Sequence, residues 1–168
     1  LKSYGADPTR WYMITNAQPW DNLKFDLAGI TEVRNKFFGT LTNTYNFFAM
    51  YANLDGFVPK GIKEEDLTEL DRWILSRLNQ VTDEITIGYK SYELDRATRP
   101  IVDFIDDLSV WYLRRSRERL KYGDLADQRQ TLSTLREVLH TLALVMAPSM
   151  PFFAEYLYRA VRTKTDPE

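Results

Sequence analysis

The 168-residue sequence has no cysteine, a single histidine and seven glycines, each standing apart from the others. Without cysteine, disulfides, thiolate zinc sites and a cysteine nucleophile are excluded. Isolated glycines leave no glycine-rich loop to cradle a phosphate group. His140 follows Glu137 at the spacing found in di-iron bundles, but such a site needs a second motif of this kind. No nucleophile motif accompanies His140 either, so we expect no metal site and no catalytic residue.

Long apolar runs are also missing. The longest, residues 142–147, is too short to span a bilayer and ends at Pro148. No signal peptide opens the chain, which begins at Leu1 rather than at a methionine. We therefore expect a cytoplasmic location, no membrane contact, and a chain that is a piece of a longer protein.

The sequence has no large excess of either charge, since its net charge is −2 at pH 7. This balance argues against indiscriminate nucleic-acid binding, but the charged residues are unevenly distributed along the chain. Residues 114–121 read RRSRERLK, five positive charges against one glutamate. A basic patch on a mildly acidic protein fits a specific RNA contact.

What the sequence does contain is helical periodicity. Apolar residues recur at spacings of three and four through most of the chain, and no long stretch alternates with a period of two. The pattern predicts an all-α fold, an antiparallel bundle of about five to six helices. The predicted helices cover residues 8–17, 27–53, 69–88, 92–122, 126–147 and 151–162.

Several residues predict how these helices begin and end. Asp7 before Pro8 predicts an N-cap, as does Asp26, where Phe25 and Ile30 are placed as a hydrophobic staple. Ser91 is a further candidate N-cap and Gly123 a candidate terminator. Because the apolar stripe continues past Pro100, we expect one helix over 92–122, kinked at this proline.

The basic run supplies the main candidate binding residues. On a helical wheel, Arg115 and Arg119 extend the apolar stripe onto open surface, and Arg114 and Arg117 widen the positive surface. Trp111 lies at the edge of the stripe, and we expect it beside the helix over 27–53. Arginine matches phosphate geometry, and an exposed indole offers a face on which an RNA base stacks. The alternative is structural: the cations complement the helix dipole, or Arg115 and Arg119 pair with carboxylates inside the bundle.

The helix over 27–53 carries a second set of candidates. Asn43, Asn46 and Met50 fall opposite its apolar face. Amide side chains hydrogen-bond base edges, so Asn43 and Asn46 are candidate RNA contacts. Exposed asparagine on a helix more often has no such role.

Six blocks of sequence carry a family resemblance. They are YGADPTRWYM (4–13), PWDNLKFD (19–26), VRNKFFGTLTNTYNFF (33–48), LDRWILSRLN (70–79), DDLSVWYLRRSRER (106–119) and MAPSMPFFAEYLY (146–158). Together they resemble isoleucyl-tRNA synthetases over nearly the whole chain. The fourth and last blocks are shared among class I synthetases for branched aliphatic amino acids, and the second favours isoleucine.

This resemblance implies a division of the chain and a partner. Residues 1–26 would be a stem-contact and linker segment that follows the absent KMSKS loop, and residues 27–168 the anticodon-binding bundle. The partner would be the anticodon stem-loop of isoleucine tRNA, contacted through the Trp-Tyr pair at 111–112 and the arginines that follow. One departure is Val110, where many relatives have asparagine.

The resemblance also implies what lies elsewhere. ATP and magnesium would be used by an absent catalytic domain, an editing domain would be a further part of the same chain, and zinc would belong to absent C-terminal parts. The whole enzyme would be an isoleucine–tRNA ligase, and we expect a monomer. Two alternatives stay open: a helical protein–protein interaction module, and the equivalent domain of a valyl- or leucyl-tRNA synthetase.

Overall fold

The computed structural model describes residues 3–17, 20–22, 24–54, 56–59, 61–164 and 166–167. Within these ranges every regular element is helical, which confirms the all-α prediction. The elements are α1 (Ala6–Asn16), α2 (Leu27–Val33), η1 (Arg34–Phe38), α3 (Gly39–Leu54), η2 (Glu64–Asp66), α4 (Glu69–Lys90), α5 (Leu94–Asp106), η3 (Asp107–Leu113), α6 (Arg114–Tyr122), α7 (Leu125–Met146) and α8 (Pro151–Val161). No helix among the described residues combines the length and apolar character that crossing a membrane requires.

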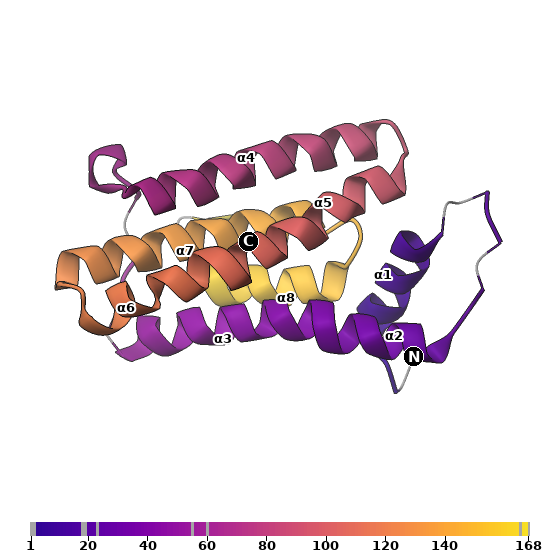
Figure 1. The fold of residues 1–168 in the computed structure, drawn as a ribbon, viewed down its shortest axis with the longest axis horizontal. Helices are drawn as coiled ribbons and strands as arrows, with labels where there is room; N and C mark the ends of the chain where they lie inside the picture. Colours follow the sequence, from indigo (N-terminus) through magenta and orange to yellow (C-terminus); the bar gives the residue numbers. More distant parts are fainter. Residues whose placement is uncertain are drawn as a thin grey trace.

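The long helices alternate in direction (Figure 1). The rod formed by α2, η1 and α3 runs along one edge of the view and α4 along the opposite edge, while the rod formed by α5, η3 and α6 passes between them. Helices α7 and α8 complete the bundle, and α1 lies across one end. The basic run on α6 is thereby placed between α4 and α3.

The core follows the predicted spacing of three and four, because residues at these intervals share one face of a helix. Its buried side chains include Ile74, Leu78, Val81 and Ile85 of α4, Ile101, Ile105 and Leu108 of the middle rod, and Leu132, Leu135, Leu139, Leu142 and Met146 of α7. By area, each buried leucine or isoleucine contributes about 1.5–3 kcal/mol.

Within the long helical rods, two segments depart from α-helical geometry, and both are π-helical: η1 and η3. The short η2, between α3 and α4, is a 3-10 turn. In η1, the Gly39 N–H donates to the carbonyl of Arg34, five residues earlier. The prediction of one helix over 92–122 is confirmed from Leu94 onwards, but Pro100 lies within regular α5. The irregular part begins seven residues later, at Asp107.

The predicted helix ends are partly confirmed. The Asp26 carboxylate accepts a hydrogen bond from the Ala28 N–H, as expected of an N-cap. Ser91, in contrast, closes α4, and Glu93 precedes α5. Gly123 ends α6 with φ −64°, outside the left-handed region. Its lack of a side chain matters sterically, because a Cβ there would lie 2.4 Å from the Arg119 carbonyl oxygen.

Asp7 was predicted to cap its own helix and instead caps another. It lies inside the first turn of α1, and its buried carboxylate accepts a hydrogen bond of 2.6 Å from the Phe153 N–H at the start of α8. Arg10 donates to the carbonyls of Pro148 and Ser149, both at 3.0 Å. Since these contacts are tertiary, helix α1 is fastened to the corner between α7 and α8.

The predicted staple of Phe25 and Ile30 is not what holds the start of α2. Ile30 is buried, but Phe25 is 55% exposed. The Phe25 ring lies edge-on to the ring of Tyr12, with centroids 6.1 Å apart. The Tyr12 hydroxyl in turn accepts a hydrogen bond from the Asp26 N–H. The entry to α2 is therefore fixed by α1.

Helices α4 and α5 approach each other closely at Gly88. A Cβ at Gly88 would lie 2.6 Å from the backbone nitrogen of Ala97. We expect Gly88→Ala to lower the free energy of unfolding by about 1–3 kcal/mol, because backbone must move apart to admit the methyl group.

Gly39→Ala is the matched control for this test. At Gly39, also within a helical rod, a Cβ would have its nearest neighbour at 3.8 Å. The better helix propensity of alanine should then stabilise the protein by up to about 1 kcal/mol. Urea unfolding measures the change in unfolding free energy of both variants, which should be negative for Gly88→Ala and positive for Gly39→Ala. Equal stabilisation of the two would contradict the close approach of α4 and α5 at Gly88.

Candidate nucleic-acid interface

The start of the basic run presents an aromatic and cationic surface to solvent. Trp111 of η3 is 48% exposed. The Arg115 guanidinium carbon lies 3.8 Å from the centroid of the Trp111 ring, a cation–π stack. Trp73 of α4 approaches Trp111 edge-on, with ring centroids 6.4 Å apart. These three residues form what we call the indole surface.

The position of Trp111 differs from the prediction in one respect. Sequence reasoning placed it beside the long helix that carries Asn43 and Asn46. Its aromatic neighbour in the structure is on α4 instead. Trp111 therefore marks the α4 side of the middle rod.

The α3 side of the same rod carries a second surface. The Arg117 guanidinium carbon lies 5.8 Å from the centroid of the Phe47 ring. Asn43, Asn46 and Met50 are exposed on the same face of α3 as Phe47, because the four positions are spaced by three and four. The candidate amides thus lie beside Arg117, while Arg114 is exposed on the helix between the two surfaces.

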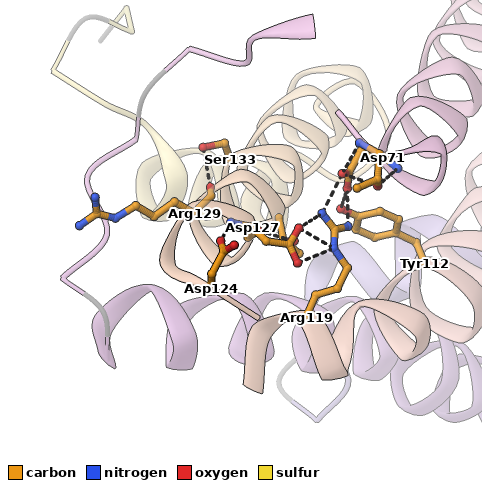
Figure 2. A network of polar contacts seen from close by, with 9 residues as sticks. Asp71, Tyr112, Arg119, Asp124, Asp127, Arg129 and Ser133 are labelled. Carbon is orange, nitrogen blue, oxygen red and sulfur yellow. Dashed lines mark hydrogen bonds and ion pairs between the residues drawn. The ribbon is translucent and has the colours of Figure 1, made fainter. Parts of the chain in front are cut away.

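Arg119 is turned away from both surfaces. Its guanidinium donates two parallel hydrogen bonds of 3.0 Å to the Asp71 carboxylate, and Asp127 binds it from the other side at 2.6 Å. Figure 2 shows the guanidinium held between these two carboxylates. The Arg119 side chain is only 17% exposed and that of Asp71 is fully buried. The prediction that Arg119 lies on open surface is wrong, and the alternative of carboxylate pairing describes it.

Asp71 is the centre of this network. It also accepts a 2.6 Å hydrogen bond from the buried Tyr112 hydroxyl. With Thr68 it forms a capping box at the start of α4. Burial alone would raise the pKa of Asp71, but hydrogen bonds from Arg119, Thr68 and Tyr112, with the charge of Arg119, outweigh it and lower the pKa. One carboxylate therefore joins the first turn of α4 to the middle rod and, through Arg119, to α7.

The lowered pKa predicts an acid-dependent loss of stability. A carboxyl group whose pKa is lower when folded contributes stability that is complete above its ordinary pKa, 3.8 for Asp71, and is lost as the pH falls through the folded pKa. The difference in unfolding free energy between the wild type and Asp71→Asn should be constant above about pH 5 and shrink below about pH 4. Urea unfolding at a series of pH values measures it. A difference that persists unchanged to low pH would show that the ionisation of Asp71 does not contribute.

His140, weighed in the sequence as a ligand, lies elsewhere. Its ring is 5.2 Å from that of Tyr158, and its Nε2 is 3.8 Å from the carboxylate of Asp166. Burial, with the neighbouring Arg136, lowers its pKa. Across the described residues, no group of three or more histidine, cysteine, aspartate or glutamate side chains is arranged to hold a metal ion.

Two aromatic residues of these surfaces were not predicted. Trp73 and Phe47 belong to the predicted core-facing helices and are only partly buried, each packed beside the core. Each contributes through a partner on another helix, Trp111 and Arg117 respectively. Spacing along one helix carries no signal for such a pairing.

The chain is thus an antiparallel helical bundle that carries its basic helix, α6, between α3 and α4. A family model described as the anticodon-binding domain of tRNA ligase matches residues 71–167. The chain belongs to this family.

Similarity to full-length proteins indicates the kind of tRNA ligase more narrowly. The chain is 51% identical to an isoleucine–tRNA ligase of Bacteroides thetaiotaomicron over 98% of its own length, and 53% identical to that of Bacteroides fragilis over 94%. It is 41% identical over its whole length to the isoleucine–tRNA ligase of Chlamydia trachomatis. The resemblance found in the sequence is confirmed. The chain spans only 14–16% of the length of these curated relatives.

Proposed function

We propose that this chain binds the anticodon stem-loop of isoleucine tRNA, as the RNA-binding part of a longer isoleucine–tRNA ligase. The observation that carries the proposal is the half-exposed Trp111 with Arg115 stacked on it, flanked by the exposed Arg114 and Arg117. Flat stacking faces beside arginines are the chemistry with which proteins hold single-stranded loops of RNA.

The proposal gives different roles to the candidate residues. Arg114, Arg115 and Arg117 neutralise loop phosphates, and Trp111 stacks a base. Asn43 and Asn46 hydrogen-bond base edges on the α3 side. Arg119 acts indirectly: paired with Asp71 and Asp127, it fixes the orientation of α6 and so of the three exposed arginines.

The rest of the longer protein completes the proposal. Ligation of isoleucine with ATP takes place in domains outside this chain, in a monomeric cytoplasmic enzyme. Residues 1–26 form the stem-contact segment that precedes the bundle. The contacts of Asp7 and Arg10 support this role, since they fasten α1 to the α7–α8 corner and would hold both RNA-contacting parts in one fixed arrangement.

A salt titration of tRNA binding tests the proposal. Binding of isoleucine tRNA to the chain should weaken steeply with salt, with a log–log slope of about −0.7 to −0.9 for each phosphate contact. Valine and leucine tRNAs should compete partly, because backbone contacts supply most of the affinity. Filter binding from 50 to 300 mM salt measures both effects.

Trp111→Ala is the informative variant in this titration. It should leave the salt slope unchanged and weaken binding by about 1–3 kcal/mol, the usual contribution of a stacked base. Salt-insensitive binding by the wild type, or no binding at low salt, would favour the helical protein–protein module instead.

A further inference from the structure

A hollow of about 580 Å³ opens beside the indole surface. It is lined by Trp73 of α4 and by Asp106, Asp107, Val110 and Trp111 of the middle rod. Its walls combine indole rings, which stack on any nucleobase, with carboxylates, which phosphates avoid. This composition differs from that of the neighbouring arginines.

The two carboxylates are not equivalent. Asp107 is occupied, because Nε and Nη2 of Arg77 both lie 3.0 Å from its Oδ2. Asp106 is exposed, and among the described residues no hydrogen bond or ion pair reaches it. The hollow therefore offers one free carboxylate, an acceptor of two hydrogen bonds beside a stacking face.

The chemistry of a free carboxylate selects what enters. A phosphate group would be repelled, whereas an N–H donor would be attracted. Among the four bases, guanine alone carries two adjacent donors on its Watson–Crick edge, N1–H and the 2-amino group. Adenine and cytosine each place an amino donor next to a ring-nitrogen acceptor, and uracil has one N–H between two carbonyls. A carboxylate accepts the guanine pair in the same parallel geometry with which it accepts arginine.

We infer that this hollow is a subsite for an unstacked guanine, whose ring packs on the indoles of Trp73 and Trp111 while Asp106 accepts hydrogen bonds from N1–H and the 2-amino group. The inference rests on the proposed function, since the guanine belongs to the bound RNA loop. It assigns base selection to Asp106, a residue outside the basic run.

The test uses RNA stem-loops with seven-nucleotide uridine loops that carry a single guanine at each position in turn. At one loop position, guanine should strengthen binding about 5- to 150-fold over uridine, the range of a good two-bond base contact. Inosine at that position, which lacks the 2-amino group, should lose part of the gain. Tryptophan fluorescence during the titration reports stacking on the indoles.

Asp106→Asn gives the test its sharpest outcome. An amide presents one acceptor and one donor, so it cannot accept both guanine N–H groups and instead matches a donor next to an acceptor, as on adenine and cytosine. The variant should therefore lose the preference for guanine over adenine and cytosine at the same position. Asp103→Asn is the control, because it removes the same charge from an exposed position on α5 outside the hollow. It should retain the guanine preference, and both variants should melt at the wild-type temperature.

The possible failures separate the inference from the proposed function. Salt-dependent binding to every stem-loop without a guanine preference would overturn the inference and leave the proposed function standing. Absence of salt-dependent binding would overturn both. A third outcome is that guanine has no effect, while an arginine-rich peptide displaces the RNA from the wild type but not from Asp106→Asn. The hollow would then bind a cationic side chain of a protein, and the inference would be wrong.

Discussion

Replacing Arg119 with methionine should lower the free energy of unfolding by about 3–5 kcal/mol, because it leaves the buried carboxylate of Asp71 without its charged partner. The salt slope of tRNA binding should stay at its wild-type value, since Arg119 faces two carboxylates rather than solvent. Chemical unfolding and salt titration of the same variant give both numbers.

Arg114→Met is the matched control for this result, with the same substitution on an exposed arginine of α6. Its free energy of unfolding should change by at most about 0.5 kcal/mol. Its salt slope should become less steep by about 0.7–0.9, the loss of one phosphate contact. The double variant Asp71→Asn/Arg119→Met should recover part of the lost stability, because no uncompensated charge remains buried. A reduced salt slope in Arg119→Met, with stability intact, would contradict the pairing described above.

Replacing Arg114, Arg115 and Arg117 together with alanine should nearly abolish tRNA binding at physiological salt. Each lost phosphate contact costs about five- to eightfold at 0.1 M salt, so three contacts cost about 100- to 500-fold. The melting temperature should change little, since all three side chains are exposed. Filter binding at several salt concentrations measures the loss in affinity and in slope.

The control is a second triple variant that removes three positive charges at the other end of the bundle. Lys90, Arg96 and Arg99 are exposed around the turn between α4 and α5, far from α6 (Figure 1). Their replacement with alanine should weaken binding only slightly. Equal losses in the two triple variants would mean that net charge, and not the surface on α6, governs binding.

Most of the bundle could be predicted from the sequence because burial repeats along a helix. Apolar residues spaced by three and four, such as Ile74, Leu78, Val81 and Ile85, are buried in the structure. The caps at Asp26 and at the start of α4 depend on neighbours within a few residues, so local sequence contains their signal. Asp7 could not be assigned in this way, because its hydrogen-bond donor, Phe153, lies far along the chain.

The candidate site was less predictable because of η3. A π-helical turn closes hydrogen bonds one residue further along the chain than an α-helical turn, which shifts the following helix by about one residue on the wheel. The helical wheel drawn from the sequence placed Arg115 and Arg119 on the apolar stripe. In the structure, the buried residues of α6 are Ser116 and Leu120 instead. Arg115 consequently turns outward onto Trp111. Sequence periodicity alone gives no sign of such a turn.

The fixed start of α4 has a consequence for how this domain tolerates change in length. Because Asp71 is tied to Arg119 and Thr68, the register of α4 does not depend on the polar segment that leads into it from α3. The exposed Gly61 has no atom within 4 Å of where a Cβ would stand. Doubling such a connection costs only about 0.6 kcal/mol in chain entropy. This connection is therefore where the domain should accept an insertion, a tag or a fused partner without disturbing α6.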